Sequence, residues 1–267
     1  MPFGLTNAPA TFQRAMDIAL SSVSRRCAMV YIDDVLVFSK TFEEHLDNVR
    51  EVMASFERVN LKLKLSKCTF IATELKFLGH LINREGVRMD PEKVKTVREW
   101  QPPTSVKEMQ QFLGFVNYYR DFVKGFASLS QSLYHVAAAK IGKHMRFSDI
   151  FTEELKVHFE TLKRSIASAD DGPTLIYQNF DKPFRLTTDA HPNGVGAILS
   201  QLDQNGHDRP IAFASSGVDA QMRQRYEIAM LTSLGATEAE CLAMVFGMTH
   251  FRQYLYGRNF FLRTTKL

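Results

Sequence analysis

The sequence Tyr31-Ile32-Asp33-Asp34 places two adjacent carboxylates between two short apolar runs, at 28–30 and 35–38. Each run is typical of a β-strand, so the acidic pair falls where a hairpin would turn. Like charges this close repel each other unless a cation neutralises them. Mg²⁺ prefers carboxylate oxygens and often bridges substrate phosphates. The pattern favours metal-assisted nucleotidyl transfer, although Asp-Asp also occurs in turns for conformational reasons alone.

The composition is that of a globular protein with a mildly basic surface. The chain has 267 residues, is 45% apolar and carries a net charge of +4. This charge is compatible with a polyanionic partner. Its three cysteines form no CxxC pair, which argues against disulfides and a zinc site. No apolar run reaches about 18 residues, so we expect a soluble, intracellular protein without membrane contact.

Hydrophobic periodicity divides the chain into three sections. The first, 1–88, combines helices at 7–23 and 42–59, a strand at 61–63 and a hairpin arm at 76–83. The second, 89–170, is mostly helical. There, Asp90-Pro91 begins a helix that ends at Trp100, and Ser105-Val106-Lys107-Glu108 fits a capping box opening a helix to about Val123. A loop at 137–144, a helix at 152–166 and a linker at 169–173 follow.

The third section, 171–267, alternates strands with a helix. Strands are predicted at 184–188, 194–201, 211–215 and 260–263, and a helix at 236–256. An acidic residue ends the first of these strands, and the order of elements suggests an α/β domain.

Four segments resemble, in order and spacing, the palm of reverse transcriptases from gypsy-class LTR retrotransposons. They are 1–14, beginning Met-Pro-Phe-Gly-Leu, then 31–34, 65–70 and 76–80, which reads Lys-Phe-Leu-Gly-His. The segment 113–122 is similar to the region after the palm in that family. The resemblance implies an α+β multidomain fold: a partial polymerase palm (1–88), a helical thumb/connection (89–170) and a C-terminally incomplete ribonuclease H-like α/β domain (171–267).

In this resemblance Asp33 and Asp34 are the catalytic, metal-binding palm aspartates. Two metal ions would activate the primer 3′ hydroxyl and stabilise the leaving pyrophosphate. The other matching positions imply substrate binding, although Lys67 could equally be a solvated turn residue and Phe77 a core residue. These positions are Gly4, Asn7, Gln13, Tyr31, Lys67 and the primer-grip residues Phe77, Leu78 and Gly79.

The third section resembles the ribonuclease H domain of the same family. Thr187-Thr188-Asp189-Ala190, followed by 194–201, matches its opening hairpin, and Glu240 precedes a Cys-Leu-Ala run as in the glutamate helix. Asp189 and Glu240 would therefore be catalytic metal ligands. Glu238 lies two positions away and cannot share that helix face. The alternatives are an exposed strand end for Asp189 and a solvated helix residue for Glu240.

The chain departs from the family pattern at both ends. The third palm aspartate precedes the segment at which this chain starts. Where the family has Thr-Asp-His, this chain reads Thr264-Thr265-Lys266-Leu267, so the third ribonuclease H aspartate is replaced by Thr265 or lost. Residues 227–235 look like extra sequence. We therefore expect a fragment of an RNA-directed DNA polymerase with ribonuclease H that does not polymerise alone. A non-catalytic nucleic-acid-binding remnant and a decayed open reading frame are the alternatives.

The resemblance also implies a cofactor and partners. The cofactor is Mg²⁺, with Mn²⁺ as a substitute. The partners are RNA template, DNA primer, RNA–DNA hybrid, dNTP and other parts of the polyprotein, without a membrane. The expected location is the cytoplasm, in a virus-like particle, with access to the nucleus.

Overall fold

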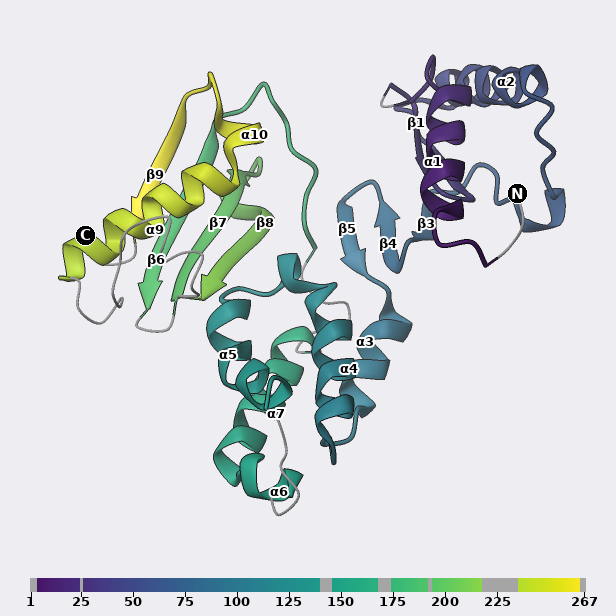
Figure 1. Cartoon of the computed structure of the whole chain (residues 1–267). Helices are drawn as coiled ribbons and strands as arrows, with labels where there is room; N and C mark the ends of the chain where they lie inside the picture. The colour runs from purple at the N-terminus through teal and green to yellow at the C-terminus, as the bar shows by residue number, and fades with distance from the viewer. Residues whose placement is uncertain are drawn as a thin grey trace. The chain divides into compact units, whose positions relative to one another are not determined.

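The computed structural model describes residues 4–24, 26–139, 146–167, 174–191, 194–217 and 235–264. The chain divides into two compact units, Met1–Thr73 and Glu74–Leu267. Their elements are labelled in Figure 1.

The first unit packs two helices against a β-hairpin. Its core is formed by residues of both helices and of the first strand, among them Met16, Leu20, Ala28 and Phe56. Both predicted helices and the predicted hairpin are confirmed. The elements are α1 (Ala8–Ala19), β1 (Ala28–Tyr31), β2 (Asp34–Val37), α2 (Phe42–Arg58) and the short 3₁₀ turn η1 (Leu65–Lys67).

The strand predicted at 61–63 is wrong. Asn60 has a φ of 55°, and the Leu61 amide donates to the Phe56 carbonyl. An Asn in this left-handed conformation after a helix is a common helix stop. The alternation of leucine and lysine that follows reflects the packing of Leu61 on the first unit's core, without a neighbouring strand.

The second unit begins with an antiparallel three-stranded sheet. Its strands are β3 (Glu74–Phe77), β4 (His80–Asn83) and β5 (Gly86–Met89). The single arm predicted at 76–83 is therefore two strands joined at Leu78 and Gly79. Both turn residues have positive φ angles, which glycine adopts freely and which allow a tight two-residue hairpin.

Helices follow this sheet, as predicted. The Asp90 side chain accepts from the Glu92 amide at one helix start, and the Ser105 side chain accepts from the Glu108 amide at another. The second helix ends at Asn117 rather than near Val123, because Tyr119 and Phe122 pack into the core beyond it. The elements are α3 (Pro91–Glu99), α4 (Val106–Asn117), η2 (Arg120–Phe122), α5 (Phe126–Ala137), α6 (Phe147–Ile150) and α7 (Glu153–Ala167).

The predicted loop and linker can be followed only in part. Residues 140–144 of the loop, and the linker at 169–173, lie outside the described residues.

A four-stranded mixed sheet completes the second unit, in the order β8-β7-β6-β9. Strand β9 runs parallel to β6, and the other neighbours are antiparallel. Helix α9 lies across one face of this sheet (Figure 1). The helix predicted at 236–256 is interrupted at the buried Phe251. The elements are β6 (Phe184–His191), β7 (Gly194–Leu202), β8 (Asp208–Gly217), α9 (Ala236–His250), α10 (Arg252–Leu255) and β9 (Phe260–Thr264).

No helix in the described part of the chain is both long and apolar enough to cross a membrane.

Candidate metal and nucleic-acid sites

The acidic pair of the first unit lies at the tip of the β1–β2 hairpin. Tyr31 pairs with Asp34 across the strands, so Ile32 and Asp33 form the two-residue turn. Ile32 has a φ of 52°. A β-branched residue is strongly disfavoured in this left-handed region and stays there only when its surroundings hold it. Contacts with the rest of the unit must therefore stabilise the turn that carries the carboxylates.

Gln13 of α1 holds this turn. Its Oε1 accepts a hydrogen bond from the Ile32 amide at 2.6 Å, and its Nε2 donates to the Val30 carbonyl at 3.3 Å. The same Nε2 also donates to Asp17 Oδ1 at 2.9 Å. The sequence predicted a place for Gln13 near a nucleotide pocket. The structure places its amide against the backbone beside the acidic pair.

The carboxylates themselves face solvent. Asp33 and Asp34 are exposed, and the Tyr31 side chain is 54% exposed. Adjacent exposed carboxylates are hard oxygen ligands that a divalent cation can reach. Of the predicted first-unit residues, Gln13 is the one that hydrogen-bonds to the turn in the described structure. Gly4 and Asn7 lie in the exposed segment before α1, and Lys67 is exposed in η1.

The three predicted primer-grip residues lie in the second unit. Phe77 ends β3, and Leu78 and Gly79 form the turn before His80. All are half-buried. Their surroundings include two tyrosines that follow α4, whose hydroxyls bond to the turn.

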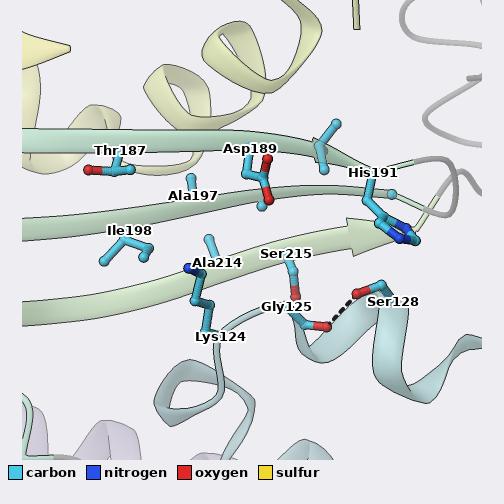
Figure 2. Close-up of a pocket in the computed structure, with 13 residues that line it drawn as sticks. Lys124, Gly125, Ser128, Thr187, Asp189, His191, Ala197, Ile198, Ala214 and Ser215 are labelled. Atoms are coloured by element: carbon cyan, nitrogen blue, oxygen red, sulfur yellow. Dashed lines mark hydrogen bonds between the residues drawn. The ribbon is translucent and has the colours of Figure 1, made fainter. Parts of the chain in front are cut away.

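Asp189 lies on the sheet face opposite to helix α9. Ala190 packs with Leu242 and Ala243 of α9, and neighbouring residues of a strand point to opposite faces. The half-buried Asp189 accordingly lines a small pocket, with a volume of about 60 Å³, on the α5 side. Figure 2 shows its carboxylate among the other residues of this pocket, which include Lys124, Ser128, His191 and Ser215.

Glu240 lies on the α9 side of the sheet. It is 4% exposed, and its Oε2 has no hydrogen-bond partner among the residues that the structure describes, as is also true of Thr188 Oγ1. Buried polar atoms are rarely left unpaired, so such an oxygen is available to a cation or a hydrogen-bond donor. Glu238 instead accepts from the Gly235 amide at the helix start. The two glutamates thus have different surroundings, and the choice of Glu240 over Glu238 stays a prediction.

The fit of these acidic residues to a metal is partial. The unpaired Glu240 oxygen suits a cation, but Asp189 lies on the other face of the sheet. Within the described ranges, no three His, Cys, Asp or Glu side chains gather where a metal ion could be held. Asp189 and Glu240 therefore offer one carboxylate each, on opposite faces of the sheet. Thr265, the residue predicted to replace the family's aspartate, lies outside the described residues.

The chain combines an acidic hairpin whose turn is hydrogen-bonded by a helix, a helical region, and a mixed sheet with a long helix across one face. These are the features of a nucleic-acid polymerase joined to a nuclease-like domain. Residues 1–82 match the family "Reverse transcriptase (RNA-dependent DNA polymerase)", and residues 151–262 match "RNase H-like domain found in reverse transcriptase". The chain belongs to the gypsy-class retrotransposon Pol polyproteins and carries their reverse transcriptase and ribonuclease H-like region.

Relatives in Drosophila melanogaster match nearly the whole chain. The retrovirus-related Pol polyproteins from transposons opus and gypsy are 38% and 34% identical to it, each over 96% of its length. The chain spans about a quarter of the length of each relative. A solved foamy viral protease-reverse transcriptase, in complex with double-stranded DNA, matches 98% of this chain and 43% of its own, with a TM-score of 0.79 and 21% identity. A second, in complex with RNA/DNA hybrid, has a TM-score of 0.73. These likenesses confirm the fold class.

Two sets of contacts were not visible in the sequence. The first is the role of Tyr118 and Tyr119, whose hydroxyls bond to a turn 40 residues earlier in the chain. The second is the cover over Asp189, because nothing in the sequence pairs α5 with β8.

Proposed function

We propose that this chain serves RNA-directed DNA synthesis and the cleavage of RNA in RNA–DNA hybrids, as the corresponding region of a retrotransposon Pol polyprotein. The observation that carries the proposal is the hairpin turn with Asp33 and Asp34, held open to solvent by Gln13. The family matches support it, because both activities belong to the intact family. The neighbours solved with DNA and with RNA/DNA hybrid support nucleic acid as the partner.

Asp33 and Asp34 would hold Mg²⁺, for which Mn²⁺ can substitute. The bound ion supplies positive charge against the phosphates of primer and dNTP. Gln13 fixes the backbone that carries both carboxylates. Tyr31, exposed beside Asp34, is placed to contact the primer end, and Gly4, Asn7 and Lys67 are proposed contacts for dNTP or template.

Asp189 and Glu240 would serve the second activity, in hybrid cleavage. The buried and unpaired Oε2 of Glu240 supports a ligand role, since a carboxylate there is otherwise unfavourable. In the polyprotein, the chain would work beside other Pol segments in a cytoplasmic virus-like particle with access to the nucleus.

A test of the proposal combines binding with metal mapping. The chain should bind RNA–DNA hybrid with an affinity that falls as salt rises. Fe²⁺ in place of Mg²⁺, with peroxide, should cut the backbone near residues 31–35, and Asp33→Asn with Asp34→Asn should abolish that cut. Asp47→Asn is the matched control, since Asp47 is an exposed α2 carboxylate paired with Arg50. Cutting that survives in the double variant would contradict the metal assignment.

One observation favours a second candidate, a non-catalytic nucleic-acid-binding protein. The pocket beside Asp189, at about 60 Å³, has room for water or an ion but not for a nucleic-acid strand. A hybrid-cleavage assay in Mn²⁺ separates the two candidates. Cleavage that Asp189→Asn removes supports the nuclease, and salt-dependent binding without cleavage supports the binding protein.

A further inference from the structure

The β3–β4 turn has an unusual backbone. Phe77 pairs with His80, and the two residues between them have φ angles of 47° at Leu78 and 71° at Gly79. Glycine takes this conformation freely, whereas a leucine is disfavoured in it. Something outside the turn must therefore hold Leu78.

Two adjacent tyrosines after α4 bind the carbonyls of this turn. Tyr118 Oη donates to the Leu78 carbonyl at 2.6 Å, and Tyr119 Oη donates to the Gly79 carbonyl at 3.0 Å. The residues are 40 positions apart in sequence. The Leu78 carbonyl also lies 2.8 Å from His80 Nδ1, and the Gly79 carbonyl accepts from the Asp90 amide at 3.1 Å.

The ring of His80 fills the space between the turn and the tyrosines. Its centroid lies 5.3 Å from that of Tyr118, 5.6 Å from that of Tyr119 and 5.5 Å from that of Phe122. Burial lowers the pKa of His80 below its ordinary value, which favours the neutral ring. The turn, the histidine and the two tyrosines thus pack against one another as a single cluster.

Tyr119 fits the turn closely. A Cβ added to Gly79 would lie 2.9 Å from Tyr119 Oη, closer than real Cβ contacts. Tyr119 is 3% exposed, and burial raises its pKa to about 12. Its hydroxyl therefore keeps its proton and remains a donor at any physiological pH.

We infer that Tyr118 and Tyr119 are positioning residues that set the shape of the Leu78–Gly79 turn for the phosphodiester backbone of a primer strand. The carbonyl oxygens of the turn carry partial negative charge, which would repel a phosphate. The tyrosine hydroxyls bind both oxygens and offset that charge. The inference rests on the proposed function, in which Phe77, Leu78 and Gly79 contact the primer.

The test uses the full chain and two duplexes of equal length. One has a DNA primer with a recessed 3′ end on an RNA template, and the other is a blunt hybrid. Fluorescence anisotropy gives the affinity for each, and hydrogen exchange of residues 76–83 reports the turn. The variants are Tyr118→Phe and Tyr119→Phe. Tyr256→Phe, at the 76% exposed tyrosine that ends α10, is the control.

We expect each positioning variant to lose the preference for the recessed end by roughly fivefold, the factor typical of one hydrogen bond. Exchange in 76–83 should rise, while Tyr256→Phe should change neither. Faster exchange with an unchanged preference would overturn the primer role, and unchanged exchange would overturn the role in shaping the turn. If the unmodified chain itself fails to prefer the recessed end, the proposed primer contact fails with it, and the exchange measurement still decides whether the tyrosines hold the turn.

Discussion

At the scale of single residues, Glu240 stands out because one oxygen of its buried carboxylate has no hydrogen-bond partner within the described part of the chain. This oxygen is Oε2, and among the described residues the same holds for Thr188 Oγ1 of β6. Burying polar groups without partners is unfavourable, so natural sequences keep them mainly where a function requires them. Replacing Glu240 by an apolar residue should therefore stabilise the fold and remove the function.

We predict that Glu240→Leu raises the free energy of unfolding of the second unit by about 1–3 kcal/mol, because an apolar side chain of similar size removes the unpaired oxygen. Urea unfolding followed by tryptophan fluorescence measures this, since Trp100 packs on the same unit's core. Any hybrid cleavage should be lost. As a contrast, Glu238→Leu should lower stability, because it removes the bond from the Gly235 amide. A less stable Glu240→Leu variant would show that the carboxylate has a compensating partner.

Tyr119 gives a pH-dependent prediction. Its folded-state pKa of about 12 lies above the ordinary tyrosine value of 10.0, chiefly because of burial. The folded chain therefore keeps this proton at pH values where the unfolded chain has lost it. The associated stability is complete below pH 10 and is lost as the pH rises towards 12, by at most about 2.7 kcal/mol. Tyr119→Phe should flatten this part of the stability curve in urea titrations between pH 9 and 12. An equally steep curve in both proteins would assign the loss to other groups.

At the scale of elements, the sequence predicts a helix start or a turn best where residues close in sequence determine it. Asp90 and Ser105 start helices because their side chains accept from amides two or three residues on, and this pattern is visible in the sequence. The acidic hairpin is equally local. The strand predicted at 61–63 failed because Asn60 in a left-handed conformation, rather than hydrophobic alternation, decided the path of the chain. The Tyr118 and Tyr119 contacts span 40 residues, so only the fold reveals them.

Gly86 joins two elements of the second unit and gives an element-scale prediction. Val87 and Leu175 exchange backbone hydrogen bonds of 2.8 and 2.9 Å, which tie β5 to the segment leading to β6. A Cβ on Gly86 would lie 2.1 Å from the Leu175 carbonyl oxygen. We expect Gly86→Ala to destabilise the unit by about 2–4 kcal/mol, through two lost hydrogen bonds and backbone strain.

The matched control is Gly206→Ala. Gly206 also has a positive φ, of 79°, but a Cβ there would meet nothing within 4 Å. Only the conformational cost of about 1 kcal/mol remains. Thermal unfolding of both variants measures the difference. Equal losses would mean that the Val87–Leu175 pair contributes nothing beyond backbone conformation.

At the scale of the second unit as a whole, the helical region and the mixed sheet are joined on the Asp189 face. Arg120 donates to the Ser215 carbonyl at 2.8 Å, and the Ala127 amide donates to Ser215 Oγ at 2.9 Å. The turn at the start of α5 therefore covers the pocket that Asp189 lines. Access to that carboxylate and the docking of the helices on the sheet compete for the same surface. Neither partner of this contact shows a sequence pattern that would indicate it.

Ser215→Ala tests this competition, because it leaves the Ala127 amide without its side-chain acceptor while keeping the strand intact. A lost hydrogen bond of this kind lowers stability by about 1 kcal/mol and loosens the docked turn. Hydrogen exchange of residues 124–129 should become faster, and any Mn²⁺-dependent hybrid cleavage should rise because Asp189 is less covered. Ser216→Ala is the control, since the Ser216 hydroxyl bonds to the Gly217 carbonyl of its own strand. If exchange rises while cleavage stays constant, the cover over Asp189 does not limit access, and the sheet serves the hybrid from another face.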